Sequence, residues 1–358
     1  MLSEIEKIEQ ISSWLDIPAV AAARAHVPGL AFRSFQGEED FPRMVAVITA
    51  SKDADRIERV DKVEDVARVY AHLTNCDPFT DMVFAMVNEE VVGYSRVTWL
   101  KEEAGRWVYV HFGFLKPAWR RCGIGQAMLK IDQQRLRLIA AGHLREGKRM
   151  PDTPAVFQSW ASDTETGAQA MLANAGYQPV RFGYTMVRPD LEDIPDLPLP
   201  PGIEVRPVDW QSHKRQIFLA EAEAFRDHWG YSVPTEEDYQ GWLADIEENP
   251  DIDPALWRIA WQGDQLVGQV RSYILPDENE YYGRQRGWTE DISVGRPWRR
   301  QGVARALIAL SLKALKARGM QEAALHVDTQ NPTGALKVYE FMGFRPVKVD
   351  TTYEHPLE

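Results

Sequence analysis

The sequence predicts a mixed α/β (α+β) fold in two tandem domains, each with a mostly antiparallel, twisted sheet flanked by helices. Its 358 residues are too many for one ordinary hydrophobic core. A proline- and acid-rich stretch near the middle has neither a helical nor a strand period, and a turn rich in arginine and glycine occurs once on each side of it. These observations together indicate two halves built on one plan.

The central stretch, Arg188 to Gly202, has the composition of a semi-rigid linker. Residues Ser3 to Ala25 look helical and have no counterpart in the second half. We therefore expect an N-terminal helical extension at residues 1–30, a first domain at 31–188, a linker at 189–202 and a second domain at 203–358.

Each half runs in the order strand, helical region, hairpin, strand, Arg/Gly turn, long helix, strand, helix, strand. The hairpins are predicted at Val83 to Arg96, around Asn88-Glu89-Glu90, and at Arg258 to Arg271, around Gln262-Gly263-Asp264-Gln265. This order does not match a doubly wound fold of repeated βαβ units.

Charge and cysteine usage narrow the function classes. The net charge of −12 argues against a general nucleic-acid binder, and it is compatible with a cationic substrate or simply with a solvated acidic surface. The two cysteines, Cys76 and Cys122, form no CxxC pair or metal-ligand cluster, so no metal site is expected. No signal peptide or membrane-spanning run is visible, which predicts a cytoplasmic protein without a membrane partner.

The Arg/Gly turn of the second half is a candidate anion site. Ile292 and Val294 alternate with polar residues as in a strand, and a helical leucine pattern follows the turn up to Gly319. A strand, a tight turn and a helix N-terminus direct unpaired N–H groups and the helix dipole at one point, which suits a pyrophosphate. The turn residues are Arg299, Arg300, Gln301, Gly302, Val303 and Ala304.

The pattern Arg-x-x-Gly-x-Gly/Ala between a strand and a helix resembles the acetyl-CoA-binding signature of the GCN5-related N-acetyltransferase (GNAT) family. It is matched by Arg120, Gly123 and Gly125 in the first half and by Arg299, Gly302 and Ala304 in the second. The resemblance covers both predicted domains. The tandem arrangement, the linker and the ending Val349 to Tyr353 are similar to tandem GNAT proteins related to mycothiol synthase.

The resemblance implies that the strand before each turn is splayed from its neighbour and pairs with pantetheine. The backbone groups would come from Ile292 and Val294, and from Gly113 and Leu115. Asn331 would contact the pantetheine arm, and we expect it to cap a helix that has Pro332 at its first position. In the first half the implied acetyl-CoA-binding residues are Leu115, Arg120, Arg121, Gly123, Ile124 and Gly125.

Acetyl transfer to an amine needs a base, a donor for the oxyanion and an acid for the departing thiolate. Glu290 and Asp291 precede the turn, where family members carry the general base or the anchor for the amine. Strand alternation predicts that Glu290 shares a face with Ile292 and that Asp291 points the other way. Backbone N–H groups near Val294 would polarise the thioester, and Tyr339 stands where the family has its general acid.

The first half looks degenerate. Aligning Gly176-Tyr177 with Gly343-Phe344 places Leu172 at the position of Tyr339, and leucine cannot donate a proton. On the strand, His111 and Phe112 are aligned with Glu290 and Asp291. We expect this half to be non-catalytic, whether or not its turn still binds acetyl-CoA.

The sequence therefore predicts an acetyl-CoA-dependent N-acetyltransferase that acts on a small amine by direct attack in a ternary complex, as a monomer or homodimer. A non-catalytic acyl-CoA-binding or sensing protein and a protein or peptide N-acetyltransferase stay open as alternatives.

Overall fold

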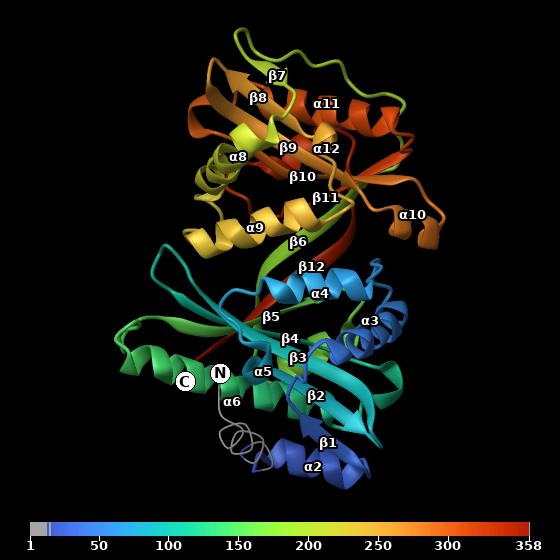
Figure 1. Ribbon diagram of the computed structural model, residues 1–358, viewed down its shortest axis with the longest axis vertical. Helices are drawn as coiled ribbons and strands as arrows, with labels where there is room; N and C mark the ends of the chain where they lie inside the picture. The colour runs from blue at the N-terminus through green and yellow to red at the C-terminus, as the bar shows by residue number, and fades with distance from the viewer. Residues whose placement is uncertain (1–12, 14–15, 358) are drawn as a thin grey trace. The chain divides into compact units, whose positions relative to one another are not determined.

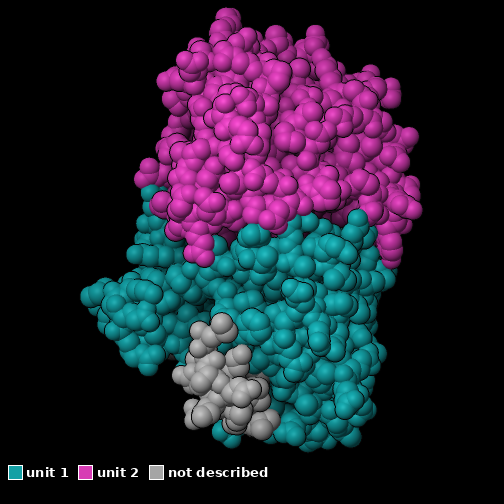
Figure 2. Space-filling view, in the orientation of Figure 1, with its two compact units in different colours: residues 1–180, 352–358 teal, residues 181–351 magenta. Residues whose placement is uncertain are grey.

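The computed structural model describes residue 13 and residues 16–357. The chain forms two compact units, residues 1–180 with 352–358 and residues 181–351, which are coloured separately in Figure 2. Of the expected N-terminal extension, residues 1–12, 14 and 15 lie outside the described residues, and the described part contains helix α2 (Pro18–His26).

The strands of unit 1 are hydrogen-bonded in the order β1-β2-β3-β4-β5, followed by the end of β12. Only β4 and β5 are parallel in this run of described pairs. The elements of unit 1 labelled in Figure 1 are α2, β1 (Leu30–Arg33), α3 (Phe41–Asp55), α4 (Val63–Ala71), α5 (Pro78–Asp81), β2 (Met82–Val87), β3 (Glu90–Lys101), β4 (Trp107–Leu115), α6 (Ile124–Arg145) and β5 (Ala155–Ser162). Helix α7 (Thr166–Asn174) follows β5.

Unit 2 repeats this plan in the strand order β6-β11-β10-β9-β8-β7, and β10 and β11 are its parallel pair. Its elements are β6 (Gln178–Arg188), β7 (Glu204–Arg206), α8 (Trp210–Phe225), α9 (Glu236–Glu248), β8 (Arg258–Gln262), β9 (Gln265–Ile274), α10 (Pro276–Tyr282), β10 (Arg286–Val294), α11 (Val303–Ala317), β11 (Glu322–Asp328), α12 (Ala335–Phe341) and β12 (Arg345–Pro356). Short 3-10 turns lie at Glu38–Asp40, Pro117–Trp119, Pro254–Leu256 and Arg296–Trp298.

Local sequence explains the turns that set this register. Asn88 and Glu89 both have positive φ, of 47° and 70°, as the tight turn between β2 and β3 requires. Gly319 follows α11 with φ of 85°, and the N–H of Met320 bonds back to the carbonyl of Leu315, as in a Schellman cap. Both predicted hairpins and the mixed, mostly antiparallel fold are confirmed.

The limits of the compact units differ from the sequence-based boundaries at both C-terminal strands. Strand β6 passes from unit 1 into unit 2 after Val180, and β12 passes from unit 2 into unit 1 after Thr351. The end of β12 is anchored in unit 1, where Tyr353 joins the core and the Leu357 N–H bonds to the Ala155 carbonyl at 3.0 Å. Composition marks the linker but carries no signal for which strands a terminal strand joins.

The strands of each unit are covered on both faces. In unit 1, α6 packs on one face through Leu129 and Leu136, and α3 packs on the other through Met44 and Val47. In unit 2, α11 takes the place of α6, and α8 and α9 cover the opposite face. None of the described helices is long and apolar enough to cross a membrane.

Candidate active site

The site in unit 2 begins where two parallel strands separate. Strand β10 pairs with β11 only from Arg286 to Trp288. Beyond Trp288, β10 continues against β9 and β11 continues against β6. The facing edges of the strand ends thus have no strand between them among the described residues, and such edges can pair with the amides of an extended ligand.

A β-bulge lies at this divergence. The register places Glu290 opposite Arg271 and shifts by one residue before Ser293, and Asp291 has φ of 49°. The bulge directs Asp291 to the face of Arg271, with which it forms an ion pair at 3.0 Å, whereas Ile292 packs into the α11 core. The expectation that Glu290 shares its face with Ile292 is therefore wrong, because simple alternation fails at a bulge.

Arg271 forms ion pairs with acidic groups beside the point where β10 and β11 separate. Its guanidinium is buried, lies over the rings of Trp242 and Trp257, and pairs with both Asp291 and Glu221 of α8. Burial raises the pKa of Glu221, and the nearby Asp291 adds to this effect. One arginine thus faces two carboxylates, with Glu290 directly opposite it on β10.

Glu290 bridges the two diverging strands. Its Oε1 accepts the backbone N–H of His326 on β11 at 2.9 Å and lies 2.7 Å from Nδ1 of the same residue. The His326 ring stacks on Trp288 with centroids 5.0 Å apart. Burial raises the pKa of Glu290, against the opposing effect of its hydrogen bonds to His326.

Tyr339 of α12 is buried and packs against Phe344 in the core of unit 2. Its hydroxyl makes no hydrogen bond among the described residues. Burial raises its pKa, and the nearby Glu290 carboxylate adds to the shift. The phenol is therefore held protonated at neutral pH.

The turn before α11 has the shape of an anion-binding loop. Arg300 and Gly302 both have positive φ, of 64° and 91°, and no described atom lies within 4 Å of the position that a Cβ on Gly302 would take. Its open side, at the N-terminus of α11, suits the close approach of a phosphate. The predicted contact residues from Arg299 to Ala304 are contiguous here, with Val303 buried as the first residue of the helix.

The side chain of Arg299 bonds to other groups of the protein and not to solvent alone. Its Nε donates to the Val294 carbonyl at 3.1 Å, and its Nη1 pairs with Asp227 at 2.7 Å. Hydrogen bonds from Arg296 and Arg299 hold the pKa of Asp227 well below its usual range. Arg299 therefore fixes the turn to the end of β10, and Arg300 is the exposed cation of the pair.

The segment before α12 differs from its prediction. The helix begins at Ala335, after Gly334, and not at Pro332. The side-chain oxygen of Asn331 instead accepts from the N–H and hydroxyl of Thr333, which closes a turn ahead of the helix. Its amide nitrogen lies 3.3 Å from Nε2 of His228.

The turn of unit 1 has the same backbone shape. Arg121 and Gly123 have φ of 66° and 92°, and Arg120 donates to the Leu115 carbonyl at 3.1 Å while pairing with Asp55. Its surroundings are more crowded, because a Cβ on Gly123 would lie 3.5 Å from Ala23 of α2. At Gly125, near the buried Ile124, a Cβ would lie 3.3 Å from the sulfur of Met171.

The strand register corrects one alignment between the halves. Phe112 lies opposite Arg96, three positions beyond Gly93, and Glu290 lies opposite Arg271, three positions beyond Gly268. Phe112, and not His111, is thus the counterpart of Glu290. The bulge in β10 adds one residue that β4 lacks, so spacing from the turn misaligns the strands.

His111 is part of the core of unit 1. It is buried and lies 2.7 Å from the Tyr177 hydroxyl, and burial lowers its pKa to about 3. A histidine with this low pKa is neutral and poorly basic at physiological pH, which supports a structural role.

Comparisons with known proteins identify the family. The model of the acetyltransferase (GNAT) family matches residues 46–137 and 216–344, which is more than half of the chain. The chain belongs to the GNAT acetyltransferase family. It is an N-acetyltransferase, of a family that uses acetyl-CoA.

Two curated relatives cover most of this GNAT chain. The mycothiol acetyltransferase of Catenulispora acidiphila is 27% identical over 326 residues, covering 87% of this chain and 96% of the relative. The mycothiol acetyltransferase of Thermomonospora curvata is 28% identical over 271 residues, covering 74% and 79%.

Solved structures share the tandem fold. A GNAT protein from Sphaerobacter thermophilus has a TM-score of 0.67 at 23% identity and covers 92% of this chain and 96% of its own. A tandem GNAT protein from the clavulanic acid biosynthesis pathway has a TM-score of 0.62 at 14% identity and covers 92% and 99%. The expected tandem GNAT resemblance is confirmed.

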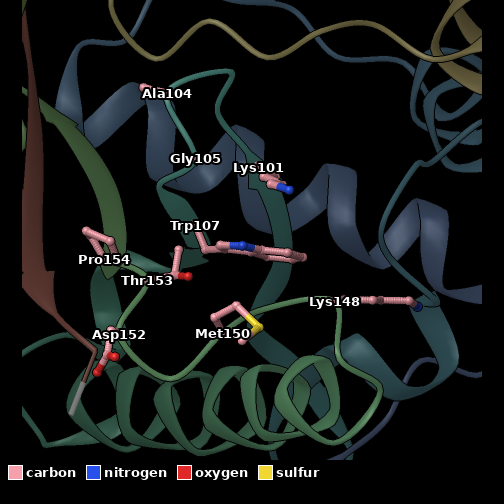
Figure 3. Close-up of a pocket in the computed structure, with 9 residues that line it drawn as sticks. All are labelled: Lys101, Ala104, Gly105, Trp107, Lys148, Met150, Asp152, Thr153 and Pro154. Carbon is pink, nitrogen blue, oxygen red and sulfur yellow. The ribbon is translucent and has the colours of Figure 1, made fainter.

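A pocket of unit 1 lies away from the Arg/Gly turn of that unit. It is lined by Trp107 at the start of β4, by Met150 and by the ammonium-bearing Lys101 and Lys148, as Figure 3 shows. The Arg/Gly turn follows the other end of β4, so this hollow is not the acetyl-CoA site. No group of three or more His, Cys, Asp or Glu suited to a metal ion occurs in the part of the chain that the structure describes.

Sequence reasoning missed three polar residues of the site, namely Glu221, Arg271 and His326. Each looks ordinary in sequence, because an acid on a helix and an arginine or histidine on a strand are usually surface residues. Their pairing with Glu290 and Asp291 depends on strand register and on the bulge. A search for charged residues at the buried positions of β9 would have found Arg271.

Proposed function

We propose that unit 2 transfers an acetyl group from acetyl-CoA to a primary amine of a small molecule in a ternary complex. The observation that carries this proposal is the arrangement at the divergence of β10 and β11. There Glu290 bridges the strands, and burial together with its charge raises the pKa of Tyr339. The open turn at Gly302 follows β10 in the chain. We further propose that unit 1 is a non-catalytic partner domain.

The residues present fit acetyl-CoA, which supplies the activated thioester. The backbone from Arg300 to Ala304 would hold the pyrophosphate at the start of α11. The end of β10 at Ile292 and Val294, together with Asn331, would hold pantetheine. Backbone N–H groups near Val294 would then stabilise negative charge on the thioester oxygen.

The acidic groups suit a cationic acceptor. A free alkylamine has a pKa of about 10 and reaches the enzyme protonated. Asp291 and Glu290 place negative charge beside the divergence, which favours binding of the ammonium group. The raised pKa of Glu290 makes the site more basic than an exposed carboxylate, as proton removal from the amine requires.

Tyr339 would protonate the departing sulfur. Its hydroxyl has no competing hydrogen bond among the described residues, and its raised pKa keeps the proton available. In unit 1, Leu172 is the buried residue at the corresponding place in α7. The relatives named mycothiol acetyltransferase support a small-molecule acceptor rather than a protein.

The test is thiol release from acetyl-CoA with a panel of polyamines, aminoglycosides, amino sugars, amino acids and lysine peptides. We expect turnover with at least one small amine, and a decrease of kcat of about 10²- to 10⁴-fold in Tyr339→Phe with acetyl-CoA affinity unchanged. Leu172→Phe is the matched control and should keep full activity. Turnover with peptides alone would replace the small-molecule acceptor, and an unchanged rate in Tyr339→Phe would remove Tyr339 from the mechanism.

A further inference from the structure

His326 stands at the point where the reacting groups of the proposed transfer must meet. It is the second residue of β11 after Ala324, the last that pairs with β10. It faces Glu290 across the divergence, on the face that also carries Asp291 and Arg271. Its side chain is 56% exposed, so a ligand at the strand ends can reach it.

The contacts of His326 fix its orientation and its tautomer. The ring stacks on Trp288 at an interplanar angle of 11°, and Nδ1 lies 2.7 Å from Glu290 Oε1. A carboxylate accepts hydrogen bonds, so the hydrogen belongs to Nδ1, and the lone pair of the neutral ring is on Nε2. Nε2 has no hydrogen-bond partner among the described residues.

The charges around His326 favour proton uptake. Burial lowers the pKa of His326, and Lys348 of β12 adds to this, whereas Glu290 and Asp350 of β12 raise it. The net shift is upward. A carboxylate behind an imidazole stabilises the imidazolium that forms when Nε2 takes a proton.

In unit 1, aromatic residues replace both members of this pair. Phe112 is the counterpart of Glu290, and Trp160, the second residue of β5 after the last one paired with β4, is the counterpart of His326. These two rings contact each other with centroids 5.3 Å apart. The side chains at these two positions thus contact each other in both units, through polar groups in unit 2 and through apolar rings in unit 1.

We propose that His326 is the residue that takes the proton from the acceptor amine, and that Glu290 positions it and stabilises its charged form. This inference rests on the proposed acetyl transfer in unit 2. The ammonium gives one proton to Nε2, the nitrogen forms its bond to the thioester carbon, and the carbon–sulfur bond breaks. The nitrogen loses a second proton, which goes to the Tyr339 oxygen and replaces the proton that Tyr339 gives to sulfur. The proton on His326 passes to solvent.

The experiment compares pH profiles of kcat/KM for the full-length protein with its best amine from the panel. His326→Asn keeps a donor toward Glu290 but has no base at Nε2. We expect a decrease of about 10²- to 10⁴-fold near neutral pH, loss of the limb that reports the imidazole, and partial recovery at high pH as free amine accumulates. Glu290→Gln should keep an imidazole limb but shift it to lower pH, because the ring loses its carboxylate.

A second measurement separates proton removal from a structural role. A weakly basic amine is already neutral at the assay pH, so the defect of His326→Asn should shrink with such acceptors. His26→Asn, at an exposed position of α2, is the matched control and should match the unaltered protein. Acetyl-CoA binding measured by calorimetry shows whether each variant is folded.

The outcomes separate this inference from the function on which it rests. An active unaltered protein whose profile survives in His326→Asn overturns the role of His326 and leaves the acetyl transfer standing. If the limb disappears only in Glu290→Gln, Glu290 itself is the base. If the unaltered protein releases no thiol with any amine of the panel, the proposed function fails first.

Discussion

The two units carry the same turn but different pairs at the divergence of their parallel strands. In unit 2, Glu290 and His326 join the strands by hydrogen bonds, whereas in unit 1 Phe112 and Trp160 join them by ring contact. The backbone scaffold is kept in both, down to the positive φ of the residues in the turn. The difference teaches that two units with the same turn can differ in the groups beside it, so the turn alone does not support the catalytic role that we propose for unit 2.

An arginine next to this pair also separates what the units share from what differs between them. Arg96 and Arg271 occupy matching register positions, and each lies over aromatic rings. Arg96 is held by Tyr70 and Phe112, whereas Arg271 also pairs with Asp291 of the bulge. The arginine therefore belongs to the shared scaffold, and the carboxylates around it are specific to unit 2.

The largest effect is expected from giving unit 2 the pair of unit 1. The double variant Glu290→Phe/His326→Trp should lower kcat by about 10³-fold or more, because the basic group at the divergence is gone. Acetyl-CoA affinity should change by less than about threefold, since the turn is untouched. Steady-state kinetics and calorimetric binding on the same preparation measure both quantities.

The reciprocal variant Phe112→Glu/Trp160→His is the control, and it should leave kcat unchanged because Leu172 supplies no acid in unit 1. A similar loss of kcat in the reciprocal variant would place the chemistry in unit 1. Full activity of the unit 2 variant would mean that the divergence of β10 and β11 is not where acetyl transfer occurs.

The two units also differ in features that sequence alone could and could not predict. The repeated order of elements, the hairpins and the Arg/Gly turns were predictable, because each is a local pattern with a local physical cause. The pairing of Glu290 with His326 was not, since β11 lies more than thirty residues away and the register between the strands is a tertiary property. The bulge at Asp291 defeated both the prediction of strand faces and the alignment of His111 with Glu290.

A smaller effect, on binding alone, should follow from adding a methyl group to each turn glycine. Gly302→Ala places a Cβ in the open space that we propose for the phosphate, and it strains a residue with φ of 91°. We expect KM for acetyl-CoA to rise about 10- to 100-fold, which corresponds to roughly 1.4 to 2.8 kcal/mol of binding free energy, with little change in kcat.

The matched control is Gly123→Ala, which carries the same strain at φ of 92°. It should reduce the stability of unit 1 by about 1 to 2 kcal/mol and leave KM unchanged. Equal increases of KM in both variants would contradict the assignment of catalysis to unit 2.

The smallest effect is expected on stability, at a buried helix position that differs between the units. Asp132 and Ser311 both come nine residues after the turn glycine. Asp132 accepts a hydrogen bond from the Ser95 hydroxyl at 2.7 Å, and burial raises its pKa to about 8. Ser311 lies 2.5 Å from the Ser272 hydroxyl and carries no charge.

A carboxyl whose pKa is raised in the folded state binds its proton more tightly there than in the unfolded chain. The stability it contributes is therefore complete below the unfolded pKa of 3.8 and is lost as the pH rises through about 8. Thermal unfolding should thus show the Tm of unit 1 falling between pH 5 and pH 8.5. Asp132→Asn, which mimics the protonated acid, should flatten that dependence and raise the Tm at pH 8.5 by about 5 °C or more. Ser311→Ala should shift the Tm equally at both pH values. An equal pH dependence in Asp132→Asn and the unaltered protein would show that Asp132 is ionised in the folded state.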